Sequence, residues 1–89
     1  MSMLEILLIS RDSIMQMIRE ARDPAILFGG FRGIGGTGAV NILAALPEAE
    51  CHRTVGEIMA LLGEQLDLLR LEAAIAKAKV QWAAYLPMC

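Results

Sequence analysis

The stretch TVGEIMALLGEQLDLLRLEAAIAKAKVQWAAYL, residues 54–86, decides the fold of this chain. Its apolar residues recur at alternating intervals of four and three, the spacing of a helix face that packs along another helix. Thr54 and Glu57 have the spacing of a capping box, so the pattern predicts one helix over the whole stretch. The seam consists of Val55, Met59, Leu62, Leu66, Leu69, Ala73, Ala76, Val80 and Ala83, and a flank of Ile58, Leu61, Leu68, Ile75 and Trp82 widens it.

A helix of that length is a rod of roughly 50 Å, more than the rest of so short a chain can cover. We therefore expect the seam to be buried against a second copy or against a partner helix. The expected interface residues are Val55, Met59, Leu62, Leu66, Leu69, Ala73, Ala76, Val80 and Trp82.

The N-terminal third predicts a second helix, over residues 2–22. Ser2 and Glu5 form a capping box, and apolar positions again alternate by four and three. The run at 4–9 also suits a buried strand, because so short an apolar segment has no decisive period. Asp23-Pro24 ends the helix, since the residue before proline avoids the α region.

Between these two segments the sequence predicts short elements. Residues 25–28 suit a short strand or an extended arm, and residues 39–46 a short helix with Thr37 as its N-cap. Pro47 ends that helix, and the polar residues 48–53 read as a turn. The expected fold is a single all-α domain over 1–89: a helical hairpin or small bundle with a glycine-rich elbow and a long C-terminal helix.

The composition indicates that apolar surface is left over. The 89 residues are 56% hydrophobic and 20% charged, and the mean hydropathy is +0.53. Such a chain usually hides its excess apolar surface in an oligomer, a partner or a membrane. The net charge of −2 with scattered basic residues disfavours nucleic acid, which needs clustered positive charge. Two cysteines are too few for a small disulfide scaffold, so we expect reduced thiols and a cytoplasmic protein.

The most chemistry-like motif is FGGFRGIGGTG, residues 28–38. With Gly29, Gly33, Ile34 and Gly35 it resembles the T-G-x-x-x-G-I-G turn of short-chain dehydrogenases. That resemblance implies backbone amides at Gly29, Gly33 and Gly35 that approach a pyrophosphate. The family's Tyr-x-x-x-Lys pair is absent, since Cys89 lies four residues after Tyr85, and no β-α-β alternation follows. We interpret the motif as a hinge between helices, with a minimal nucleotide-binding loop as the third hypothesis.

A membrane-associated protein is the second hypothesis. Residues 25–46 carry only one charge, Arg32, and could insert at a membrane surface. Arg32, Asn41 and the interior glycines make full insertion unfavourable.

The remaining polar residues suggest no chemistry. Cys51, His52 and Cys89 lack the spacing of a zinc site, and adjacent Cys51 and His52 rarely face each other as nucleophile and base. Glu64 and Asp67 lie three apart and suit a solvated ladder with Arg70. The sequence thus predicts a small non-enzymatic assembly or interaction protein without cofactor or metal.

Overall fold

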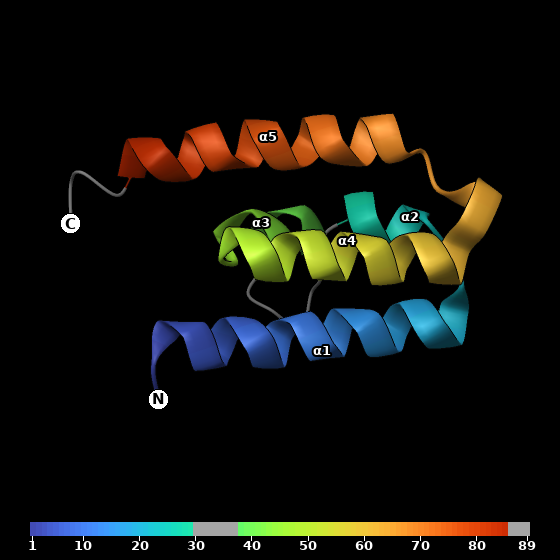
Figure 1. The fold of residues 1–89 in the computed structure, drawn as a ribbon, viewed down its shortest axis with the longest axis horizontal. Helices are drawn as coiled ribbons and strands as arrows, with labels where there is room; N and C mark the ends of the chain where they lie inside the picture. The colour runs from blue at the N-terminus through green and yellow to red at the C-terminus, as the bar shows by residue number, and fades with distance from the viewer. Residues whose placement is uncertain (30–37, 86–89) are drawn as a thin grey trace.

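The structure is a computed structural model that describes residues 1–29 and 38–85, with side chains described as far as Gln81. Within these ranges the chain forms helices and no strand (Figure 1). The predicted all-α small bundle is confirmed. Its elements are α1 (Met3–Ala21), α2 (Ala25–Phe28), α3 (Ala39–Ala45), α4 (Glu48–Leu62), the short 3-10 helix η2 (Gly63–Gln65) and α5 (Leu68–Tyr85).

The first helix has the predicted extent, but the predicted four-three alternation is not its buried face, because Met3 and Met17 of that alternation are exposed. Ser2 is the N-cap, and its hydroxyl oxygen accepts a hydrogen bond from the backbone N–H of Glu5 at 3.1 Å. The apolar run at 4–9 is helical, so the strand alternative is wrong. The helix ends at Arg22, which adopts a left-handed φ of 50° while its N–H donates to the Ile18 carbonyl.

Two short helices lie inside the bundle. The expectation of a strand or arm at 25–28 is wrong: these residues form the single turn α2, and an Asp23 carboxylate oxygen accepts from the Ala25 N–H at 2.9 Å. The helix predicted over 39–46 is present as α3, with Gly38 as its N-cap. The predicted cap, Thr37, lies outside the described residues.

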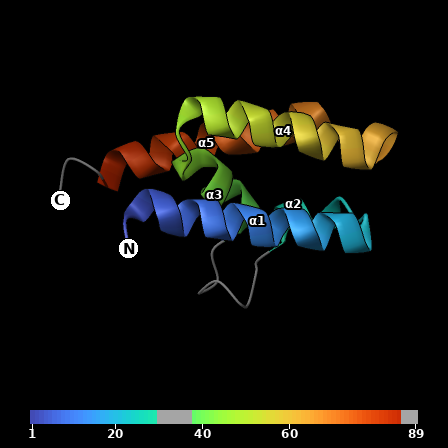
Figure 2. The ribbon, with the colours of Figure 1, turned by 60° about the horizontal axis from the view of Figure 1, so that its bottom comes forward.

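The most central helix is α3, which contacts each of the other four α-helices. It lies between α1 and α5 in both ribbon views (Figures 1 and 2). The composition of α3 suits a central place in the bundle. The helix carries no charge, and the small buried side chains of Ala39 and Ala44 let neighbouring helices approach closely. Each of the other α-helices therefore packs on α3 and not only on its neighbour in the chain.

The polar run 48–53 is the start of α4, so its prediction as a turn is wrong. Proline has no N–H to lose at a helix start, and Pro47 here precedes the first helical residue. Glu48 and Glu50 lie in the first turn, where the helix dipole favours negative charge. The Arg53 side chain pairs with Glu50 and Glu57, one turn away on either side.

The predicted single helix over 54–86 is two helices, and the capping box at Thr54 does not exist. Thr54 is in the middle of α4 and fully buried. The chain breaks at Gly63, whose φ of 56° and ψ of −130° end α4. It resumes at Asp67, whose carboxylate accepts from the Arg70 N–H at 3.1 Å and so caps α5. A long C-terminal helix is present, but it is shorter than predicted and folds back along the bundle (Figure 1).

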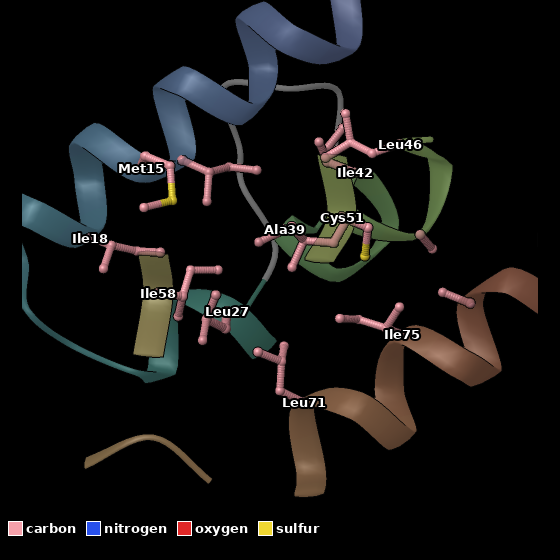
Figure 3. Close-up of a cluster of buried hydrophobic side chains, with 14 of the residues drawn as sticks. Met15, Ile18, Leu27, Ala39, Ile42, Leu46, Cys51, Ile58, Leu71 and Ile75 are labelled. Carbon is pink, nitrogen blue, oxygen red and sulfur yellow. The ribbon is translucent and has the colours of Figure 1, made fainter. Parts of the chain in front are cut away.

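One hydrophobic core joins all five α-helices. Met15 and Ile18 of α1 face Leu27 of α2 and Ile58 of α4, and Leu71 closes the cluster from α5 (Figure 3). All five side chains are fully buried. The other members are Ile14, Ala39, Ile42, Leu43, Ala44, Leu46, Cys51, Leu62, Ile75 and Ala78.

Candidate interaction surface

The outward side of α5 carries an exposed apolar row, which we call the outer stripe: Leu69, Ala73, Ala76 and Val80. Leu69 is 79% exposed and Val80 is 72% exposed, and the two alanines between them are exposed as well. Their spacing of four, three and four places them on one side of the helix. The stripe consists of residues from the second half of the predicted seam.

The opposite side of α5 faces the core. Leu71, Ile75 and Ala78 are buried there. With about 100° per residue, the centre of this buried face lies roughly 160° around the helix axis from the centre of the outer stripe. The outer stripe therefore lies on the side of α5 away from the core, although Ala76 at its border also lines a cavity between α4 and α5.

The other residues of the predicted interface do not belong to the outer stripe. Leu62 is buried in the core, and Val55 and Leu66 are half-buried and pack against it. Met59 is exposed on α4. Trp82 lies within α5, but its side chain is outside the described residues. The break at 63–67 separates these residues from the outer stripe, because it divides one continuous seam into two helix faces that point in different directions.

Charged residues border the outer stripe on both sides. Glu72 and Lys79 flank it on one side, and Arg70 and Lys77 flank it on the other, as helical geometry at about 100° per residue requires. Arg70 is held toward the body of the molecule, since its guanidinium carbon lies 3.8 Å from the centre of the Phe28 ring. That cation–π contact leaves Glu72, Lys77 and Lys79 as the charges nearest to anything that covers the stripe.

A second exposed apolar surface lies on α1, at the opposite edge of the molecule (Figure 1). It includes Met3 at 69% and Ile9 at 54% exposure, with Ile6 and Met17 less exposed. Between them the Ser10 hydroxyl donates to the Ile6 carbonyl at 2.9 Å.

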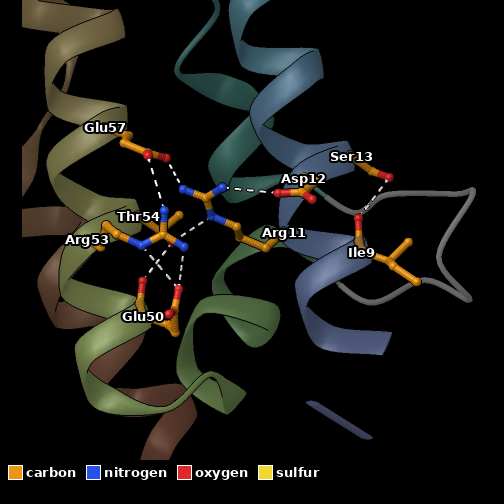
Figure 4. Close-up of polar contacts among 8 residues, drawn as sticks. All are labelled: Ile9, Arg11, Asp12, Ser13, Glu50, Arg53, Thr54 and Glu57. Atoms are coloured by element: carbon orange, nitrogen blue, oxygen red, sulfur yellow. Dashed lines mark hydrogen bonds and ion pairs between the residues drawn. The ribbon is translucent and has the colours of Figure 1, made fainter. Parts of the chain in front are cut away.

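A polar cluster sits between α1 and α4 (Figure 4). Arg11 is only 7% exposed, and its Nε donates to the Thr54 hydroxyl at 2.9 Å. Its other nitrogens donate to Asp12 and Glu57. The Thr54 hydroxyl in turn donates to the Glu50 carbonyl at 2.7 Å. Each of these side chains has a hydrogen-bond partner, so we interpret the cluster as a structural contact that holds α1 against α4.

Sequence reasoning missed this cluster. A single arginine in a helix does not reveal a partner 43 residues further along the chain. One signal was present: Arg11 falls on the apolar side of its helix, where a charged residue is buried only if it is paired. The Ser13 hydroxyl, drawn nearby in Figure 4, bonds back to the Ile9 carbonyl of its own helix.

Cys51 and His52 do not form a catalytic pair. Cys51 is buried beneath a cavity of about 210 Å³ that Val55, Ala76 and Lys79 help to line. Burial raises the pKa of the Cys51 thiol; nearby Lys79 lowers it and Glu48 raises it further. The exposed His52 side chain instead lies 3.6 Å from a Glu48 carboxylate oxygen. Cys89 is outside the described residues, among which no group of three or more potential metal ligands occurs.

The glycine candidates are only partly described. Gly29 is the C-cap of α2, and its N–H donates to the Ala25 carbonyl at 3.0 Å. Gly33 and Gly35 lie outside the described residues, and with them most of the predicted elbow. The predicted ladder of Glu64, Asp67 and Arg70 is not on one helix, because the chain breaks between the two carboxylates.

Most apolar residues of segment 25–46 that the structure describes are buried or packed against the core. Leu27, Ala39 and Leu43 are fully buried, and Ile42 is 7% exposed. Their insertion at a membrane surface would require the core to open. Of the helices described, none combines the length and the apolar character that crossing a membrane requires.

Comparisons with protein families, with curated proteins and with solved structures give no match.

Proposed function

We propose that this chain is a small, non-enzymatic assembly protein that pairs with a second copy of itself through the outer stripe of α5. The observation that carries the proposal is the position of the stripe. Leu69, Ala73, Ala76 and Val80 repeat with heptad spacing and lie opposite the buried face of the same helix. Apolar residues with that spacing form the seam of helix pairs.

The flanking charges favour a second copy in parallel orientation. In a parallel pair of helices, a residue just before one core position lies beside the residue five positions later on the partner. Glu72 then lies beside Lys77 of the other copy, and symmetry makes this ion pair twice. An antiparallel pair would set Glu72 against Lys79 on one flank but would leave Lys77 beside Arg70, with no carboxylate to pair with, on the other flank.

The expected affinity is modest. Full burial of a leucine or valine side chain contributes about 1.5–3 kcal/mol, and each copy supplies Leu69 and Val80. Association costs about 4–15 kcal/mol in lost freedom of motion. The two alanines add little area but let the helices approach closely. We therefore expect a dissociation constant no tighter than about micromolar.

The test compares substitutions on and beside the stripe. Val80→Asp places a carboxylate in the seam and should leave the protein monomeric, because burial of an unpaired charge is costly. Gln81→Asp adds the same charge to the same helix outside the stripe and should leave association unchanged. Light scattering over a concentration series measures the association of the two variants. Equal association would refute the proposal.

The ion pair has its own test. Lys77→Glu should weaken association because it sets Glu72 beside a second carboxylate, and the exchanged pair Glu72→Lys with Lys77→Glu should restore it. If the exchanged pair fails while Val80→Asp still dissociates the protein, the stripe pairs in another orientation.

A further inference from the structure

The connection between α4 and α5 is short, exposed and open to a different conformation. Gly63, Glu64, Gln65 and Asp67 are exposed, and only Leu66 packs partly on the core. The segment contains no proline. Glu, Gln and Leu are good helix formers, so Gly63 is the one residue of 63–66 that resists a helix on propensity alone.

The apolar pattern runs through this connection without interruption. The alternation of four and three from Val55 to Val80 keeps its register across residues 63–67. The uninterrupted period is therefore compatible with a continuous helix as well as with the observed hairpin. The same residues therefore suit two states, a hairpin and one continuous helix.

The hairpin is held by two local devices. Gly63 has a φ of 56° with a ψ of −130°, a backbone conformation that side chains disfavour. Asp67 caps α5 through its bond to the Arg70 N–H. Neither device involves the core, so the hairpin can open without loss of contacts within α1, α2, α3 and α4.

Beyond its connection, α5 is attached mainly to α3 rather than to α4, its neighbour in the chain. The surface that α3 offers to α5 is identical in every copy. An α5 that leaves its own α3 can therefore occupy the α3 of another molecule with the same contacts, and exchange of an identical element is a low-cost route to a dimer.

We propose that residues 63–67 act as a hinge through which two copies of this chain exchange α5. Helices α4 and α5 then join into a continuous helix over 48–85, roughly 57 Å long, which exceeds the 39 Å length of the single molecule. Leu71, Ile75 and Ala78 pack on α3 of the second copy. The outer stripe stays exposed, so this exchange does not depend on the proposed pairing of α5.

Two variants bias the hinge in opposite directions. Gly63→Ala penalises the positive φ of the hairpin and favours the continuous helix, so the exchanged dimer should become at least tenfold more stable than in the wild type. Leu68→Pro suits the hairpin, because proline is favoured at the first residue of a helix. It breaks the continuous helix and should abolish exchange. Leu68 is half-buried and lies outside the core cluster.

The readout is a distance within one chain. His52 and Lys79 line the same cavity in the hairpin, but they lie about 40 Å apart along a continuous helix. Spin labels go on His52→Cys and Lys79→Cys in a background of Cys51→Ala and Cys89→Ser. Dilution of labelled chains with unlabelled chains restricts the measurement to pairs within one chain.

We expect the Gly63→Ala dimer to show the distance of about 40 Å and Leu68→Pro to show only the short distance. Wild-type protein refolded at high concentration should show both. A Gly63→Ala dimer with only the short distance would overturn the exchange, and it would point to pairing through the outer stripe instead. Should Gly63→Ala not fold, absence of the long distance in the refolded wild type overturns the proposal equally.

Discussion

At the scale of single residues, Arg11 and Thr54 form a buried polar contact between α1 and α4. Each is buried, and each satisfies the other: the Arg11 Nε–H has Thr54 as its acceptor, while the Thr54 hydroxyl also has the Glu50 carbonyl. Thr54→Val keeps the volume and removes that acceptor. It should lower the free energy of unfolding by about 1–3 kcal/mol, because a buried donor is left without a partner.

Urea denaturation measures this effect, and a double-mutant cycle identifies its cause. In an Arg11→Met background the donor is gone, so Thr54→Val should cost clearly less than it does alone. Equal costs in the two backgrounds would mean that the hydrogen bond contributes nothing to stability.

Cys51 predicts a dependence of stability on alkaline pH. Burial raises the pKa of its thiol in the folded protein above the usual value of 9.0. The unfolded chain then releases its proton at lower pH than the folded protein does. The stability contribution is therefore complete below pH 9.0 and is lost as the pH rises through the higher folded pKa.

Cys51→Ala should remove this part of the pH dependence. Unfolding midpoints of both proteins between about pH 8 and pH 11 give the comparison, in which the other titrating groups cancel. Parallel pH profiles would show that the thiol ionises equally in the folded and unfolded states.

At the scale of helices, the structure assigns opposite roles to two leucines of α5 that are two residues apart. Leu71 is fully buried and Leu69 is 79% exposed. In dilute monomeric protein, Leu71→Ala should cost about 2–5 kcal/mol, because it leaves a cavity in the core. Leu69→Ala should change stability by less than about 0.5 kcal/mol. Thermal or urea unfolding measures the loss of stability in each variant. A larger loss for Leu69→Ala than for Leu71→Ala would mean that α5 packs on the core by its other face.

The sequence predicts the all-α fold and α1, where the Ser2 cap, Pro24 and the helical period agree, and it predicts α3 from its period and from Pro47. The prediction failed where residues that end or cap a helix disagreed with the apolar period. The run from Val55 to Val80 keeps one register, and only Gly63 and the capping residue Asp67 mark the break. Pro47 predicts the end of one helix, but it also precedes the first residue of the next.

The candidate surface was predictable in part for the same reason. Leu69, Ala73, Ala76 and Val80 belong to the predicted interface and are exposed. Leu62 of the same seam is in the core. Period shows which residues share a helix face, but tertiary packing selects the face that is buried. Two faces of α5 are apolar, so the pattern could not decide between them.

At the scale of the whole molecule, α3 holds the bundle together and α5 forms one edge of it (Figures 1 and 2). This arrangement uses the apolar segment around α3 inside the protein and leaves apolar surface on the outer side of α5. The high hydropathy of the chain is reflected in two exposed apolar surfaces, one on α1 and the outer stripe of α5, and we propose that a second copy covers the outer stripe.

The most direct test of that claim is a cross-link between two copies. Leu69→Cys in a background of Cys51→Ala and Cys89→Ser places a single thiol on the outer stripe, and Gln81→Cys in the same background places one beside it. Under mild oxidation, we predict a covalent dimer from Leu69→Cys at concentrations where Gln81→Cys stays monomeric, because parallel pairing brings the two thiols at position 69 together. Equal and slow cross-linking of the two variants would contradict the account.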